Sequence, residues 1–139
     1  MRIFVADNSP IIRERLKSMM EAVGGIDVVG ESANYSESIS EIRRTRPDVI
    51  LVDMNIAGGT GIDLLSEIHE QDWTVTKIVL SDYSTPPYRN ACMMAGADYF
   101  FDKAMDYKKL RQLIRGLASS RMLSDVDDAL YASSKRKRH

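Results

Sequence analysis

The sequence predicts an α/β protein built on a doubly wound, five-stranded parallel sheet. Five short apolar segments alternate with five segments of helical periodicity, and the connections between them are short. The third apolar segment, residues 49–52, is apolar at every position, which is typical of a parallel strand buried on both faces. These observations together favour repeated strand–helix units over an all-helical or all-strand fold.

The first strand is expected at residues 3–6. Ser9 can then act as a helix N-cap, and Pro10 suits the first helical position. Apolar residues repeat at helical spacing through residues 10–23, so a helix is expected there. The glycine pair at 24–25 should end this helix.

A second strand is expected at residues 26–30, followed by a weakly amphipathic helix at 35–46. Pro47 closes that helix, because the residue before a proline is disfavoured in helical geometry. The central strand at 49–52 comes next. The segment 54–61 after it is rich in glycine and is predicted to be a loop.

The second half repeats the same alternation. A third helix is expected around residues 62–68, a fourth strand at 77–80 and a fourth helix at about 86–95. The fifth strand is expected at 98–101, and Asp106 is placed to cap a last helix. Each strand therefore has a helix after it.

A chain of 139 residues can bury a core without disulfides or metals. We expect one domain at residues 1–118, then a polar extension at 119–139 that is partly disordered and ends in a basic tail. A short extra helix through Val126 and Leu130 is an alternative for part of this extension. With only about twenty residues after the domain, no DNA-binding output module is expected within the chain.

The single cysteine, Cys92, excludes an internal disulfide, and nothing else indicates an oxidising compartment, so we expect a cytoplasmic protein. No segment approaches the roughly 18 apolar residues that a membrane helix needs, so no membrane partner is expected. Four of the 19 basic residues lie at 135–138, and all 20 acidic residues precede them. The acidic body argues against a nucleic-acid-binding surface there.

Polar side chains follow the ends of four predicted strands: Asp7 with Asn8, then Asp53, Ser81 and Lys103. Parallel strands end at the same edge of a sheet, so these side chains should gather there. In the order 2-1-3-4-5, which is common for such sheets, the first and third strands are neighbours and a crevice opens between them. Asp7, Asn8 and Asp53 would meet at this crevice, with Ser81 and Lys103 beside it.

This set of groups suits one chemistry. Carboxylate and carbonyl oxygens at a loop are ligands for Mg²⁺, which keeps several waters. The hydroxyl of Ser81 and the ammonium of Lys103 can hold the oxygens of a phosphoryl group. The carboxylate of Asp53 can act as a nucleophile and form an acyl phosphate.

At these residues the chain resembles the receiver domain of two-component response regulators, of the single-domain type. The matching segments are VADNSP at 5–10, DMNIAGGTG at 53–61, VLS at 79–81 and GADYFFDK at 96–103. The resemblance covers about residues 1–118. It implies the flavodoxin-like receiver fold of five strand–helix units.

The resemblance also implies roles for individual residues. Asp53 would be the phosphoacceptor, with Ser81 and Lys103 assisting the transfer. Ser81 and Phe100 would form the switch that reports phosphorylation. The protein would thus be a signalling switch that catalyses its own aspartyl phosphorylation and dephosphorylation, and not a metabolic enzyme.

For the metal, the resemblance implies Mg²⁺ held by Asp7, Asn8, Asp53 and the carbonyl of Asn55. Asn8 departs from the family, which usually has a second acidic residue there, so weaker metal binding is expected.

Two further departures concern prolines. Ala57 replaces a usual proline in the loop after the phosphoacceptor. Ala104 replaces the proline that usually follows the lysine, and this removes the usual cis peptide, because a non-proline cis bond costs about 2.5–4 kcal/mol.

The expected partners are a histidine kinase or histidine phosphotransfer protein and an unknown downstream protein. Residues 88–117 form the surface expected to change on phosphorylation, and the resemblance allows this surface to form a homodimer.

Three alternatives to this function stay open. The chain could be a phosphorylation-independent pseudo-receiver, as Asn8 suggests, or the receiver fragment of a larger regulator with an output domain. A flavin-binding protein of the same architecture is disfavoured by the carboxylate of Asp7 after the first strand.

Overall fold

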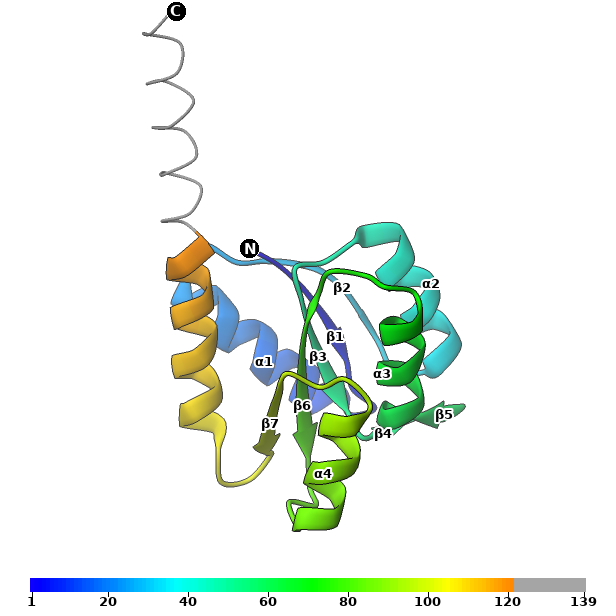
Figure 1. Cartoon of the computed structure of the whole chain (residues 1–139). Coiled ribbons are helices and arrows are strands. Elements are labelled where there is room, and N and C mark those ends of the chain that lie inside the picture. The colour runs from blue at the N-terminus through cyan, green and yellow to red at the C-terminus, as the bar shows by residue number, and fades with distance from the viewer. Residues whose placement is uncertain (122–139) are drawn as a thin grey trace, which may run out of the picture.

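A computed structural model describes residues 1–121 and contains a five-stranded parallel sheet of order β2-β1-β3-β6-β7 (Figure 1). The strands are β1 (Arg2–Ala6), β2 (Asp27–Ser32), β3 (Val49–Asp53), β6 (Thr76–Ser81) and β7 (Tyr99–Asp102). Counting these five strands alone, the order is 2-1-3-4-5, so the predicted fold class and strand order are confirmed. Each predicted strand is found within two residues of its expected ends.

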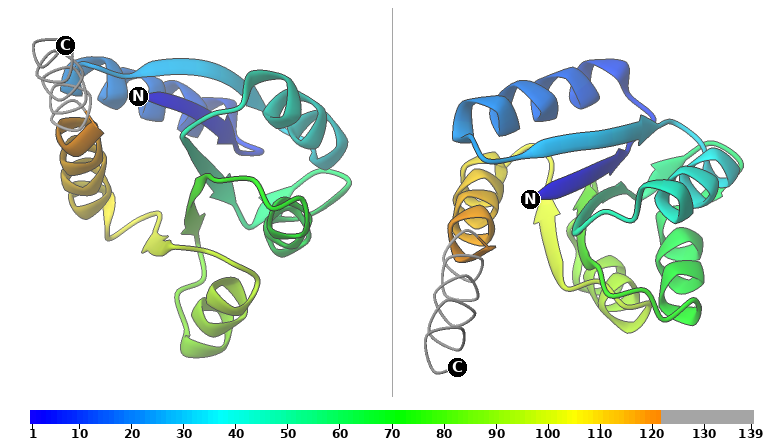
Figure 2. Two further views of the ribbon diagram at one scale, coloured as in Figure 1. Left: turned by 45° about the horizontal axis from the view of Figure 1, so that its top comes forward. Right: turned by 90° about the horizontal axis from the view of Figure 1, so that it is seen from above.

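Helices cover both faces of the sheet (Figure 2). They are α1 (Pro10–Val23), α2 (Tyr35–Thr45), α3 (Gly61–Glu70), α4 (Pro86–Met94) and a C-terminal helix whose described part spans 107–121. Ser9 caps α1 as predicted, because its side chain accepts a hydrogen bond from the Ile12 amide. Within the described residues no helix is long and apolar enough to span a membrane.

Two apolar cores result from the alternation of side chains along the strands. Phe4 and Ala6 of β1 face α2, α3 and α4, whereas Ile3 and Val5 face α1 and the C-terminal helix. All five residues of β3 are buried, as the unbroken apolar run predicts. The central strand and the residue that ends it are therefore held on every side.

The segment after β3 contains a structure that the sequence did not predict. Two short strands, β4 (Asn55–Ile56) and β5 (Gly59–Thr60), form an antiparallel hairpin within the expected loop. The chain then returns to the end of β3, where the Gly61 amide donates to the Met54 carbonyl at 3.0 Å. A Cβ at Gly61 would lie 2.6 Å from the Asp53 carbonyl oxygen, so a side chain would displace this return.

The C-terminal helix continues past residue 118 to residue 121, the last described residue. The Arg121 guanidinium lies 3.2 Å from Asp48. Asp48 directly precedes β3, so this contact lies at the amino edge of the sheet, opposite the carboxyl ends of the strands. The predicted extra helix through Val126 and Leu130, and the basic tail, lie outside the described residues.

Candidate functional site

Three charged side chains meet at the carboxyl edge of the sheet, the lower edge in Figure 1. The Lys103 ammonium lies 3.0 Å from Asp7 Oδ2 and 3.0 Å from Asp53 Oδ2. Asp7 is 1% exposed and Asp53 is 4% exposed. The structure thus brings together the residue after β1, the last residue of β3 and the residue after β7, as the strand order predicts.

Backbone amides fix the two carboxylates. Asp7 Oδ1 accepts a hydrogen bond from the Ser9 amide at 2.8 Å, at the start of α1. Asp53 Oδ1 accepts one from the Asn55 amide at 3.1 Å, at the start of the hairpin. Each carboxylate therefore has one oxygen held by its own loop, and the other oxygen turns towards Lys103.

Burial is the largest single influence on the pKa of Asp53 and on the pKa of Lys103. Burial raises the pKa of Asp53, and the nearby Asp7 charge raises it further, while the Asn55 amide and Lys103 act in the opposite direction. Burial also acts to lower the pKa of Lys103, but the carboxylates of Asp53 and Asp7 outweigh it and the pKa is raised. At neutral pH the ammonium balances only one of the two carboxylates.

This arrangement fits a divalent cation. Asp7 Oδ2 is buried, and among the described residues the Lys103 ammonium at 3.0 Å is the one polar group that faces it. Among the described residues no group of three or more Asp, Glu, His or Cys gathers to hold a metal. Two carboxylates, a loop carbonyl and waters are, however, the kind of set that Mg²⁺ accepts. Asn8 and Asn55 are exposed at the rim of the site, next to these carboxylates.

Ser81 and Phe100 lie beside the cluster, Ser81 at the end of β6 and Phe100 on the neighbouring edge strand β7. Ser81 is fully buried, and its Oγ accepts a hydrogen bond from the Tyr83 amide at 3.0 Å. Phe100 pairs with Val79 and packs on the α4 face of the sheet, to which Ser81, two residues after Val79, also points. The Arg89 guanidinium of α4 lies 5.1 Å from the centre of the Phe100 ring and covers it.

Arg13 supports the site, although its sequence position suggested only the polar face of α1. Its Nη1 donates to the Asp7 carbonyl at 2.7 Å, and its Nε donates to Glu31 Oε1 at 3.2 Å. Arg13 thereby ties the end of β1 to β2. The one feature of the sequence that could have indicated this role is that Arg13 lies near the start of the helix that follows Asp7.

Replacing Arg13 with methionine is expected to lower the free energy of unfolding by about 1–3 kcal/mol, since a buried carbonyl loses a charged donor. Chemical denaturation measures this. Lys17→Met is the matched control, because Lys17 pairs with the carboxylates of Glu14 and Glu31 near the surface and does not contact the site. An equal loss in both variants would assign the effect to the pairing with Glu31 and not to the Asp7 carbonyl.

Comparison with known proteins gives a consistent result. Residues 3–115 match the model of the response regulator receiver domain. The nitrate/nitrite response regulator protein NarP of Escherichia coli is 31% identical over 127 residues, which cover 89% of this chain and 58% of that protein. The DNA-binding transcriptional activator DevR/DosR of Mycobacterium tuberculosis is 24% identical, with 89% of this chain and 57% of that protein covered. The chain thus spans less than two thirds of the length of these relatives.

Solved structures show the same fold. A LuxR-family two-component response regulator from Aurantimonas superposes with a TM-score of 0.78 at 27% identity, over 86% of this chain and 85% of that chain. A CheY-like receiver domain protein from Methanospirillum hungatei superposes with a TM-score of 0.76 at 22% identity, over 88% and 97% of the two chains.

Proposed function

Because this chain belongs to the response regulator receiver family, we propose that it accepts a phosphoryl group on Asp53 in a Mg²⁺-dependent reaction. The observation that carries this proposal is the pair of buried carboxylates that share the Lys103 ammonium at 3.0 Å each. The donor would be the phosphohistidine of a histidine kinase or of a histidine phosphotransfer protein. The phosphorylated protein would then present a changed surface to a downstream protein.

In the proposed transfer, an oxygen of the Asp53 carboxylate forms a bond to phosphorus while the phosphorus–nitrogen bond of phosphohistidine breaks. The imidazole nitrogen keeps the electron pair of the broken bond and later takes a proton from solvent. Lys103 holds one phosphoryl oxygen by its positive charge. Ser81 accepts a hydrogen bond from the Tyr83 amide, so its own hydroxyl proton is free for a second phosphoryl oxygen.

Mg²⁺ would be held by Asp7, Asp53, the carbonyl of Asn55 and the amide oxygen of Asn8. When bound, it supplies positive charge between the Asp53 carboxylate and the incoming phosphoryl oxygens, which otherwise repel each other. The buried oxygen Asp7 Oδ2, which among the described residues faces only the Lys103 ammonium, supports this assignment.

The test is labelling with a small-molecule phosphodonor, followed by intact-mass measurement with and without Mg²⁺. We expect one phosphoryl group on the protein in Mg²⁺ and none after chelation. A protein that stays unlabelled in Mg²⁺ would instead support the alternative that the chain is a phosphorylation-independent interaction module. The exposed, neutral Asn8 is the feature that favours this alternative.

Asn8→Asp is expected to tighten Mg²⁺ binding by on the order of 1 kcal/mol or more, because it adds a full ligand charge next to a dication. The same substitution should lower the stability of the metal-free protein, since it adds a third carboxylate to a site with one ammonium. Calorimetric titration and denaturation measure the two effects. Asn90→Asp, which adds the same charge at an exposed position of α4, should leave the affinity unchanged. Equal affinities for wild type and Asn8→Asp would contradict the prediction.

Phosphorylation should change the surface formed by α4, β7 and the C-terminal helix. A phosphoryl group on Asp53 would attract Ser81 and Lys103, and Phe100 lies on the same face of the sheet as Ser81. We expect amide-exchange protection to change within residues 88–117 on addition of a phosphate mimic. Changes confined to α1 that spare residues 88–117 would show that the signal takes another route.

A further inference from the structure

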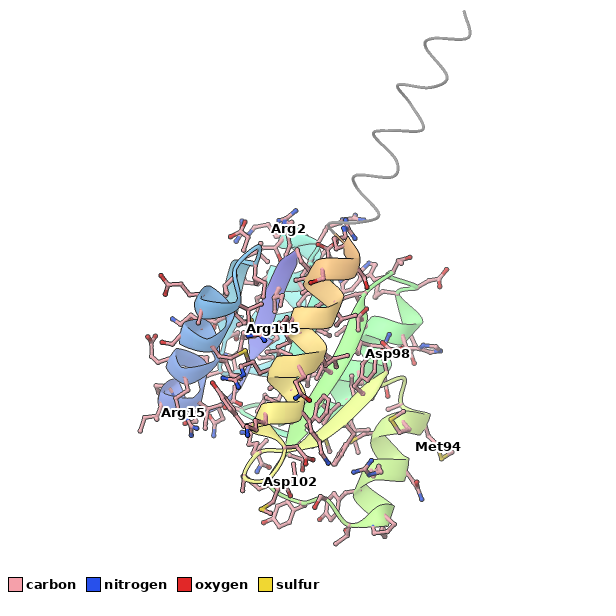
Figure 3. All side chains as sticks on the ribbon, turned by 90° about the vertical axis from the view of Figure 1, so that its left-hand side faces the viewer. Arg2, Arg15, Met94, Asp98, Asp102 and Arg115 are labelled. Atoms are coloured by element: carbon pink, nitrogen blue, oxygen red, sulfur yellow. The ribbon has the colours of Figure 1, made fainter. Side chains whose placement is uncertain are left out.

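The loop that carries Lys103 is closed by two aspartates, Asp102 and Asp106. Asp102 lies at the end of β7, where the chain turns towards the C-terminal helix (Figure 3). Its Oδ1 accepts hydrogen bonds from the Ala104 amide at 2.9 Å and the Met105 amide at 3.0 Å. Its own amide donates to Asp106 Oδ2 at 2.9 Å, and the Asp106 amide donates to the Asp102 carbonyl at 3.0 Å.

These contacts enclose Lys103 on both sides. Before the loop turns, the Lys103 amide donates to the Ser81 carbonyl at 2.9 Å, which extends the pairing of β7 with β6 by one bond. After the turn, the amides of Ala104 and Met105 are held by the carboxylate of the residue that precedes Lys103. The Cα of Lys103 is therefore fixed by its neighbours, although its own side chain contributes nothing to the turn.

The position of this Cα matters because the lysine side chain is long and flexible. Its ammonium must reach two buried carboxylate oxygens at 3.0 Å each while its side chain is only 10% exposed. A lysine side chain carries roughly 2 kcal/mol of rotamer entropy. A loop that moved would leave the ammonium to sample solvent, and the geometry towards Asp7 and Asp53 would be lost.

We propose that Asp102 is a positioning residue for phosphoryl transfer, which acts by holding the loop so that Lys103 bridges Asp7 and Asp53. This inference rests on the proposed function of Asp53. Ala104 helps to hold this loop, because its peptide N–H is one of the two donors to Asp102. A proline at this position would have no N–H to donate.

The charge state of Asp102 agrees with this role. The Met105 amide, the Ser84 side chain and the Ala104 amide lower its pKa by hydrogen bonding to the carboxylate. The ionised carboxylate is a stronger acceptor than a neutral amide oxygen.

The first experiment measures Lys103 directly and needs no phosphorylation. Wild type, Asp102→Ala and Asp102→Asn are treated briefly with a small amine-acylating reagent, and modification of Lys103 is followed by peptide mass spectrometry. Asp102→Ala should raise the rate of Lys103 acylation severalfold, because the ammonium then leaves the two carboxylates more often and meets the reagent in solvent. Asp102→Asn keeps an Oδ1 acceptor for both amides, but a neutral one, so its rate should lie between those of wild type and Asp102→Ala. Asp82→Ala removes an exposed acid near the same loop and controls for charge.

The second experiment is a double-mutant cycle on the rate of phosphorylation by a small phosphodonor at saturating Mg²⁺. Asp102→Ala should slow labelling about tenfold in the wild-type background and much less when Lys103→Met is already present. A merely structural role would give the same factor in both backgrounds and would overturn the proposal. An unchanged rate of Lys103 acylation in Asp102→Ala would also overturn it.

If Asp102→Ala does not fold, Asp102→Ser, which keeps one acceptor, takes its place in both experiments with the same criteria. A wild-type protein that shows no phosphorylation would refute the proposed function. The acylation rates would still decide whether Asp102 positions Lys103.

Discussion

Lys103→Met should lower the free energy of unfolding at neutral pH by about 3 kcal/mol, because it leaves two buried carboxylates without a counter-charge. Asp7 and Asp53 are almost fully buried, and Lys103 contacts both at 3.0 Å. Lys109→Met is the control: the Lys109 side chain is 72% exposed and lies 3.5 Å from Asp106, so its loss should change stability by less than about 0.5 kcal/mol. Urea denaturation of the two variants beside wild type measures the difference.

The loss in Lys103→Met should depend on pH in a defined direction. The folded-state pKa of Lys103 is raised, so its stabilising contribution is present at neutral pH and is lost as the pH rises through that raised value, above 10.5. On acidification the difference from wild type should also shrink, because the unpaired carboxylates of the variant take up protons. A difference that stays constant from pH 4 to pH 8 would contradict this account.

Asp53→Asn should abolish phosphorylation, because an amide cannot form the acyl phosphate, and should at the same time stabilise the protein. The variant keeps the acceptor for the Asn55 amide, and Lys103 then forms a neutral pair with Asp7. The pKa of Asp53 is raised by burial, so the folded state binds more protons than the unfolded state between 3.8 and that raised value. Wild-type stability is therefore reduced as the pH rises through this interval.

The expected gain for Asp53→Asn is on the order of 1 kcal/mol at pH 7, and it should disappear by about pH 3, well below the ordinary value of 3.8, where Asp53 is protonated in both states. Denaturation at the two pH values measures this. Asp53→Ala removes both the charge and the acceptor for the Asn55 amide, whereas Asp53→Asn removes only the charge. The difference in stability between the two variants therefore gives the contribution of the hydrogen bond. A lower stability of Asp53→Asn at pH 7 would mean that Asp53 balances Lys103 more than it repels Asp7.

Local sequence patterns were sufficient for the main elements of the fold. The apolar run at 49–52 and the Ser9–Pro10 pair each depend on residues near in sequence, and both predictions are confirmed. The hairpin formed by β4 and β5 was not predicted. It is tied by hydrogen bonds between the Ala57 region and the loop before α2, and such distant pairing leaves no periodicity in the segment itself.

The same distinction applies to the site. Asp7, Asp53 and Lys103 could be placed together because each directly follows a strand of a parallel sheet. Arg13 and Asp102 could not be recognised, since their roles consist of hydrogen bonds to the Asp7 carbonyl and to loop amides. Sequence patterns compare side chains, so they do not indicate which backbone groups a charged side chain contacts. The folded structure is needed to identify these hydrogen bonds.

The position of the phosphoryl group is the most direct test of the central claim. The protein is treated with a small phosphodonor and Mg²⁺, and the acyl phosphate is then reduced with borohydride, which converts the modified aspartate to homoserine. Peptide mass spectrometry identifies the converted residue. We predict conversion at Asp53 alone and its complete absence in a chelated sample. Conversion at Asp7 or at any other aspartate, with Asp53 unchanged, would contradict the assignment of Asp53 as the phosphoacceptor.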